Sequence, residues 1–159
     1  MREPFDLAAF LAEPRRMAQV AAVSPRGVPL LGSLWFLFAD GRFWFSSHPA
    51  TPFPKAAGSG APIAVLVDQF DPPRAIRQLR VRGPGRVEPH DEERVSAIYR
   101  RYLGPDPDSW PSFFRTRVGD PGWTLWTVRP DSGVATANPD FRPAEHRWTD
   151  LLAAPPALT

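Results

Sequence analysis

The residues that could carry chemistry are few in this 159-residue sequence, and they are widely spaced. There is no cysteine, which excludes disulfides, iron–sulfur clusters, thiolate zinc sites and cysteine nucleophiles. The three histidines, His48, His90 and His146, lie too far apart to form a local metal-binding motif. No G-x-S-x-G segment indicates a serine nucleophile. We therefore expect no metal site, and the catalytic residues stay unidentified at this level.

A single lysine, Lys55, stands out among the 19 basic residues, because all of the others are arginine. The preference for Arg, Ala and Pro is typical of GC-rich coding, so an individual arginine says little about function. The basic residues are spread along the chain and form no run of the kind that binds nucleic acid. Asp91, Glu92 and Glu93 stand where a helix is expected to begin and complement its dipole. We expect no nucleic-acid partner.

The composition is that of one folded domain. Hydrophobic residues make up 43% and aromatic residues 12%, which excludes a disordered chain despite the 21 prolines. No stretch approaches the roughly 20 apolar residues of a membrane span. Glu3, Asp6 and Glu13 interrupt the segment where a signal peptide needs an apolar run. We therefore expect a cytoplasmic protein without a membrane partner.

The first half of the chain predicts a helix followed by a β-meander. Apolar residues at helical spacing predict a short helix within residues 5–17. Strands are expected over residues 17–24, 29–38 and 42–47. Asp40-Gly41 is typical of a two-residue hairpin turn. The three prolines and two glycines of residues 48–60 predict a loop with at most one helical turn around Lys55.

The second half predicts a central strand, a bent strand and an amphipathic helix. A nearly continuous apolar run indicates a buried strand over residues 61–69. Alternation of apolar residues with arginines predicts a long strand over 76–87, bent at Gly83-Pro84-Gly85 so that it serves two edges of a small barrel. Asp91 is expected to cap the helix. A short helix over 110–117 and a closing strand pair over 122–130 and 133–138 complete the elements.

These elements indicate a mainly β fold, a small six- to seven-stranded β-barrel with a few short helices. We assign residues 1–138 to a single barrel domain with an N-terminal helix, and residues 139–159 to a proline-rich C-terminal tail. A barrel of this size can hold a small ligand, a nucleic acid or a partner chain, and the fold alone does not choose among them.

The order of these motifs resembles a known family. The segments AAVSPRGVPLLGSLWFLFADGRFWFSS and APIAVLVD, the lysine-bearing loop between them, and RQLRVRGPGRVEPHDEERVSAIYRRYLG are similar to the pyridoxamine 5′-phosphate oxidase-like family of FMN-binding split barrels. That family also contains deazaflavin-dependent reductases. The resemblance covers roughly residues 7–136 and depends on order and spacing. It implies a split barrel that forms a homodimer, with two flavin sites in the groove between the subunits.

The resemblance also implies where the cofactor binds. The FMN phosphate is expected against Phe45, Ser46, Ser47 and Lys55, because hydroxyls and a mobile lysine charge suit a phosphate. Gln78 falls where the family places a glutamine against the flavin ring system, whose polar edge needs both a donor and an acceptor.

Further contacts to the ring are implied by the same resemblance. Ser33 and Trp35 lie in the segment that lines the isoalloxazine, and Trp126 falls near a contact made from the other subunit. Each residue has a structural alternative. Lys55 can be an exposed loop charge, Gln78 a solvated strand residue, and the two tryptophans core or interface residues.

The sequence also departs from the family. The oxidase clamps the phosphate with an arginine and a lysine on its second strand, and the matching positions here, near Leu30 and Trp35, are apolar. Its C-terminal Arg-His pair, which holds the vitamin substrate, has only a displaced counterpart in Glu145-His146-Arg147. We therefore do not expect oxidation of pyridoxamine phosphate itself.

The function expected from the resemblance is that of an oxidoreductase that binds FMN at a dimer interface. It would transfer hydride to or from a small molecule that the sequence does not identify. The first alternative is a reductase on the same fold that uses an 8-hydroxy-5-deazaflavin coenzyme. The second is a non-catalytic binder of flavin or haem, for which His48 is a candidate contact.

Overall fold

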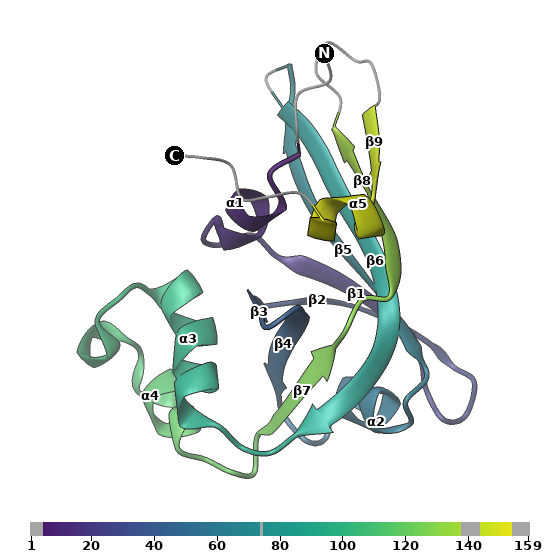
Figure 1. Ribbon diagram of the computed structural model, residues 1–159. Helices are drawn as coiled ribbons and strands as arrows, with labels where there is room; N and C mark the ends of the chain where they lie inside the picture. The colour runs from purple at the N-terminus through teal and green to yellow at the C-terminus, as the bar shows by residue number, and fades with distance from the viewer. Residues whose placement is uncertain (1–4, 74, 138–143, 154–159) are drawn as a thin grey trace.

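The computed structural model describes residues 5–73, 75–137 and 144–153, which form a mainly antiparallel β structure with short helices around it (Figure 1). The strands are β1 (Ala18–Val23), β2 (Pro29–Leu34), β3 (Leu37–Ala39), β4 (Arg42–Ser47), β5 (Pro62–Asp71), β6 (Ala75–Glu88), β7 (Thr124–Val128), β8 (Ser132–Ala137) and β9 (Ala144–Arg147). The helices are α1 (Leu7–Ala12), α2 (Pro52–Gly58), α3 (Glu92–Leu103), α4 (Ser112–Val118) and α5 (Trp148–Ala153), with a 3-10 turn at Pro107–Ser109. The expected mainly β class is confirmed, with nine strands in the described residues instead of six or seven.

Strand β6 joins the two halves of the sheet. Adjacent strands follow the order β2-β1-β5-β6-β7-β4-β3, and β8 and β9 branch from β6. The first part of β6 pairs with β5 and β8, whereas residues 85–88 pair with β7. A Cβ at Gly83 would lie 1.9 Å from the Arg129 carbonyl oxygen, and one at Gly85 would lie 2.7 Å from Ala57 Cα, so both positions require glycine. The predicted bent strand with two partner edges is confirmed.

The hairpin of β3 and β4 has the predicted two-residue turn. Asp40 and Gly41 both have positive φ, 54° and 71°, as a type I′ turn requires. The strand expected over residues 29–38 is interrupted between β2 and β3, where Phe36 is fully buried. The Phe36 N–H donates to the Tyr102 hydroxyl at 3.0 Å instead of to a neighbouring strand. This interruption adds one strand to the expected number.

The loop expected over residues 48–60 contains a helix, so the limit of one helical turn is wrong. Helix α2 has seven residues, about two turns, and begins with Pro52. Proline is tolerated in a first turn because the N–H groups there have no partner within the helix. Phe53, Ala56 and Ala57 are buried, so packing of one face stabilises this short helix.

The strand pair expected across Asp131-Ser132 is not formed. Strand β7 pairs with β4 and β6, whereas β8 pairs with β6 and β9. The N–H groups of Arg129 and Asp131 donate to the carbonyl oxygens of Pro84 and Arg82 at 3.2 and 3.0 Å. The connection therefore follows the bend of β6, and the two strands lie on different parts of the sheet.

The described structure continues past residue 138, where we expected the domain to end. Strand β9 pairs with β8, and α5 follows it directly. Trp148 and Leu151 of α5 are buried with the side chains of the barrel, and burial of their apolar surface stabilises this segment. Residues 138–143 and 154–159, which include the end of the expected last strand, lie outside the described residues.

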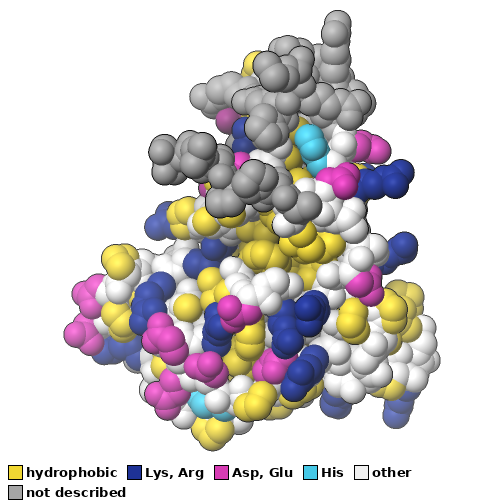
Figure 2. All heavy atoms as spheres, in the orientation of Figure 1, with side chains coloured by type: hydrophobic (Ala, Val, Ile, Leu, Met, Phe, Trp, Pro, Cys, Tyr) yellow, Lys and Arg dark blue, Asp and Glu magenta, His cyan; other side chains and the backbone are white. Residues whose placement is uncertain are grey.

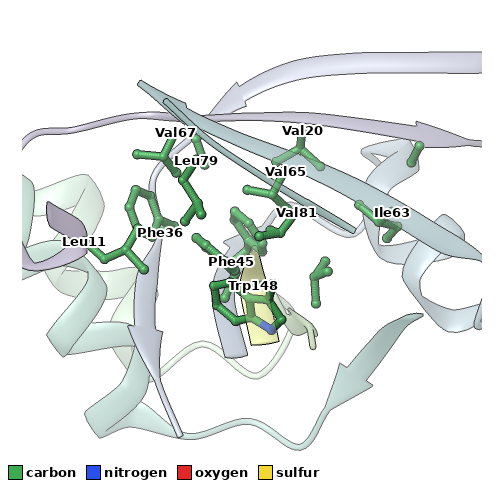
Figure 3. Packing of buried hydrophobic residues seen from close by; sticks show 14 of the residues in the cluster. Leu11, Val20, Phe36, Phe45, Ile63, Val65, Val67, Leu79, Val81 and Trp148 are labelled. Atoms are coloured by element: carbon green, nitrogen blue, oxygen red, sulfur yellow. The ribbon is translucent and has the colours of Figure 1, made fainter. Parts of the chain in front are cut away.

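The strands enclose one main group of buried side chains, here named the barrel cluster (Figure 3). Val20, Val65 and Val81 come from three neighbouring strands and point toward the same space as Phe45. Their alternate neighbours face outward, as the two-residue period of a strand requires.

Helices α3 and α4 cover the outer side of β3, β4 and β7 with a second group, here named the helical cluster. Asp91 caps α3 as predicted, accepting the Arg94 N–H at 3.1 Å. Figure 2 shows acidic and basic side chains interspersed over the helical side of the molecule. Arg42 of β4 pairs with Glu88 of β6 at 3.0 Å. The cluster contains Val95, Ile98, Tyr99, Trp110 and Leu125, with Trp35, Trp44, Tyr102 and Phe114 packed against them.

Candidate cofactor site

The structure distributes the predicted cofactor residues over three places. Phe45, Ser47 and Trp126 are buried in the barrel, Trp35 and Ser46 lie at the helical cluster, and Ser33, Lys55 and Gln78 reach the surface. Phe45 and Ser47 lie on one face of strand β4 and Ser46 lies on the other, because successive side chains of a strand point to opposite faces.

The buried group forms an aromatic stack. The Phe45 and Trp126 rings are fully buried with centroids 4.4 Å apart. The Trp126 Nε1–H donates to Ser47 Oγ at 2.9 Å, which satisfies the indole inside the barrel. These side chains fill the core and hold the end of β4 in place, so a ligand at the surface would meet the backbone of this strand.

Phe53 connects this stack to α2 and β2. Its ring lies parallel to that of Trp126, with centroids 6.0 Å apart. A Cβ at Gly32 would lie 2.8 Å from Phe53 Cε2, so the absence of a side chain at Gly32 lets Phe53 pack directly against β2. Helix α2 is thereby held against the strand that carries Ser33.

Lys55 is exposed on this anchored helix and forms no ion pair with any described residue. The segment before the helix is ordered by His48, whose carbonyl oxygen accepts from Thr51 Oγ1 at 2.7 Å. His48 Nδ1 accepts the Ala50 N–H at 3.1 Å. A rigid helix therefore presents a mobile ammonium group, which is the arrangement that a phosphate can use as a point charge.

Ser33 and Gln78 share the outer face of the sheet but lie on strands separated by β1 and β5. Ser33 Oγ accepts from Gln19 Nε2 at 3.1 Å. Gln78 lies opposite Asp68, whose carbonyl oxygen accepts from Arg16 Nη1 at 3.0 Å. At about 4.8 Å per strand, roughly 14 Å separate β2 from β6. Helix α2, which carries Lys55, packs against β6 at Gly85, seven residues along the strand from Gln78, so one chain does not gather Gln78 and Lys55 around a single point.

Charges of both signs lie near Gln78, because Arg77 precedes it and Asp68 lies opposite it on β5. Burial, and then the charge of neighbouring Arg77, lower the pKa of the Arg16 guanidinium below its ordinary value. The Gln78 side chain is half-buried and lies next to β5, the neighbouring strand of the sheet.

Trp35 and Ser46 belong to the covered side of the sheet. The Trp35 ring stacks on Tyr102 at 4.6 Å and on Phe114 at 5.2 Å. Burial raises the pKa of Tyr99, although the nearby Ser46 hydroxyl acts in the opposite direction. Trp35 therefore contacts both α3 and α4, and Ser46 lies against Tyr99 of α3.

Sequence reasoning missed Phe53 and Gln19, which position the surface residues. Phe53, Ala56 and Ala57 have the i, i+3, i+4 spacing of a helix face, a signal that the prolines concealed. Gln19 gave no local signal, because its role depends on the pairing of β1 with β2. Within the described residues, no group of three or more His, Cys, Asp or Glu side chains could hold a metal ion.

The chain is similar in structure to several solved proteins. A protein related to general stress protein 26, of the pyridoxinephosphate oxidase family, from Clostridium acetobutylicum matches with a TM-score of 0.59 and 15% identity, covering 91% of this chain and 94% of that one. A structure described as an F420 reductase has a TM-score of 0.56 and 20% identity, over 84% and 98%. The haem storage protein HutZ from Vibrio cholerae has a TM-score of 0.61 and 14% identity, over 82% and 92%.

The sequence itself matches no protein-family model and no curated protein. The chain nevertheless has the split-barrel fold of pyridoxamine 5′-phosphate oxidase-like proteins, as the resemblance implied. The open path of strands from β2 to β3 agrees with a split barrel rather than a closed one. In the described part of the chain, no helix is long and apolar enough to cross a membrane.

Proposed function

We propose that this protein is a homodimeric, cytoplasmic oxidoreductase that binds FMN and transfers hydride to or from a small molecule. One observation carries the proposal. Phe53 packs against Gly32 and Trp126 and so anchors α2 to the barrel, and Lys55, the only lysine, stands exposed on this helix. An exposed cation without an ion-pair partner among the described residues, on a rigid mount, suits a phosphate group.

The donor set supports FMN in chemical terms. Lys55 would pair with the phosphate, and the Ser33 hydroxyl would donate to an oxygen of the cofactor. The Gln78 amide would bind the polar edge of the ring. When bound, the flavin supplies the hydride chemistry, and the protein supplies position and charge. The catalytic residues are not assigned.

A dimer would complete this site, because Gln78 and Lys55 lie on separate parts of one chain. The outer face between them carries exposed apolar side chains, including Leu31, Ala21 and Ala64 in one row across three strands. Such a row is suited to burial against a second copy. The groove between two copies would then hold one flavin against each α2.

The first alternative is a deazaflavin coenzyme on the same surface, and the similarity to an F420 reductase supports it. The second is non-catalytic binding of flavin or haem, and the similarity to the haem storage protein HutZ supports haem. The hydrogen bond that His48 Nδ1 accepts places the ring proton on Nε2, so His48 would have to give up this bond before Nε2 could bind haem iron.

The test is the Lys55→Ala variant, titrated with FMN and with riboflavin at low salt. Loss of a charge-assisted contact is expected to weaken FMN binding by about 1.5–3 kcal/mol, or roughly one to two decades in Kd. Riboflavin, which has no phosphate, is expected to bind both proteins equally. Arg26→Ala, in an exposed turn, is the matched control and should leave both affinities unchanged.

Two outcomes would oppose this assignment. Equal losses for FMN and riboflavin would mean that the substitution disturbs α2 rather than a phosphate contact. No loss for either ligand would place Lys55 in solvent. The thermal unfolding of the variant should match that of the natural protein, because the side chain is exposed.

A further inference from the structure

A pocket of about 740 Å³ lies where β8 and β9 branch from β6, and no residue predicted to bind the cofactor lines it. Its volume suits a small molecule. Three arginines, Arg80, Arg82 and Arg147, contribute to its lining, together with Ser132 and the start of α5. The pocket therefore combines several fixed donors with enough space for a ligand.

The strand register explains why the arginines converge. Arg80 lies opposite Val134 on β8, and Val134 lies opposite Arg147 on β9. Paired residues of adjacent antiparallel strands point to the same face, so Arg80 and Arg147 stand on either side of Val134. Arg82, two residues along β6, lies opposite Ser132 on this face. At about 4.8 Å per strand, the Cα atoms of Arg80 and Arg147 are roughly 10 Å apart.

These three guanidinium groups form no ion pair with any described residue. Arg82 Nε donates to Ser132 Oγ at 3.2 Å, which leaves the terminal nitrogens of that side chain free to donate. Three like charges on one face repel one another, and a bound anion would remove that repulsion. The arginines are thus arranged to hold an oxyanion between them.

Two carboxylates also line the pocket, and they restrict what can bind. Glu145 lies opposite Thr136, one row beyond the pair of Val134 and Arg147, and Asp131 precedes Ser132 at the other end. The acids therefore flank the arginines instead of lying between them. A ligand whose anionic group is central and whose outer groups donate hydrogen bonds satisfies both sets.

The apolar part of the wall is provided by Val134 and Trp148. Trp148 is buried, and its Nε1–H has no hydrogen-bond partner. Figure 3 shows its ring at the margin of the barrel cluster, with the nitrogen on the side away from Phe45 and Val81. This indole is the one buried tryptophan nitrogen without a partner in the described residues, so its NMR signal is a reporter for the pocket.

We propose that this pocket binds a small acidic molecule. A phosphate or carboxylate group lies between Arg80 and Arg147, and an apolar or aromatic part lies against Val134, next to the start of α5 where Trp148 lines the pocket. Arg80 stands two residues from Gln78 on the same face, so such a ligand borders the flavin edge; only this last relation rests on the proposed function.

The experiment uses the full chain and three probes of equal ring size: phenyl phosphate, benzoate and phenol. Binding is followed by the indole N–H signals, with Trp148→Phe to assign the reporter. At least one of the two anions is expected to bind and to shift the Trp148 signal, whereas phenol does not bind. Preference for phenyl phosphate assigns a phosphate ligand, and preference for benzoate assigns a carboxylate.

The arginines are tested by Arg80→Gln and Arg147→Gln, each expected to weaken binding of the preferred anion roughly ten- to hundredfold. Arg26→Gln, exposed on a distant turn, is the matched control and should change nothing. Equal binding of phenol and the anions would overturn the proposal, as would loss of affinity in the control variant alone. The result does not depend on flavin, since the titration is made without it.

Discussion

The two outer faces of the sheet differ in how they are covered. On β3, β4 and β7, the chain covers its own sheet with α3 and α4, and Trp110 in that layer is only 2% exposed. On β2, β1 and β5, no described helix provides such a layer, and Leu31 is 78% exposed. Both faces carry apolar side chains, yet only the first is covered by described residues of the same chain.

We therefore expect residues of the covered face to contribute mainly to stability, and residues of the uncovered face to contribute mainly to binding. Aromatic residues at the covered face, such as Trp35, are already stacked on neighbours and have a structural role. The uncovered face bears Ser33 and Gln78, and α2 with Lys55 stands at its border. A second subunit and a cofactor are therefore expected at the uncovered face, and substitutions on the two faces should have different consequences.

The largest effect is expected from Tyr99→Ala on the covered face. Removal of this buried ring, which contacts Trp35, Trp110 and Phe114, should lower the free energy of unfolding by about 3–5 kcal/mol. Urea denaturation measures the loss. Tyr99→Phe keeps the ring and should retain most of the stability. A loss below about 1 kcal/mol would mean that the helical cluster is not a packed core.

On the uncovered face, Leu31→Asp is expected to separate the dimer without unfolding the chain. A charge at the centre of an apolar interface should cost about 2 kcal/mol or more, raising the dimer Kd at least thirtyfold. Light scattering over a dilution series should then approach the 17.7 kDa of one chain. Leu152→Asp, at an exposed leucine of α5, is the control. A natural protein that is already a monomer at micromolar concentration would remove the composite site.

A smaller effect is expected from Tyr102→Phe. The Tyr102 hydroxyl donates to the Arg16 carbonyl oxygen at 2.7 Å and accepts the Phe36 N–H at 3.0 Å. Loss of this link leaves two partly buried backbone groups unpaired, at a cost of about 1–3 kcal/mol. Chemical denaturation tests this value, and stacking on Trp35 should persist in the near-ultraviolet circular dichroism. Unchanged stability would show that water replaces the hydroxyl at no cost.

The smallest effect concerns alkaline pH. Burial raises the pKa of both Tyr99 and Tyr102, so the folded state favours their neutral forms. Their contribution to stability is fully present below the ordinary tyrosine pKa of about 10 and is lost as the pH rises through the higher folded values. The Tm should therefore fall above pH 10, and less steeply in Tyr99→Phe. An equal slope in both proteins would contradict this cause.

Local signals in the sequence were sufficient for several elements. The Asp40-Gly41 turn, the cap at Asp91 and the bend at Gly83 were predictable, because each depends on a backbone conformation or a close approach that few residues allow. The pairing of β7 and β8 was not, since the choice of partner depends on β6, whose paired residues lie 37 to 60 positions away along the chain.

The same limit applies to the site. Alternation along β4 was evident, but which side faces the barrel was not, so Ser46 and Ser47 could not be separated into outward and inward residues. The distance between Ser33 and Gln78 depends on β1 and β5 lying between their strands, which no local pattern reveals. The sequence did not determine whether the Lys55 side chain is exposed or buried, and in the structure it is exposed.

The central claim is that a flavin binds at the uncovered face of a dimer. It is tested most directly by the visible absorption spectrum of the protein after incubation with FMN and removal of free ligand by gel filtration. We predict the bands of an oxidised flavin at one FMN per chain, in the fraction that elutes as a dimer. A colourless dimer that takes up no FMN, or one that retains only added haem, would contradict the account.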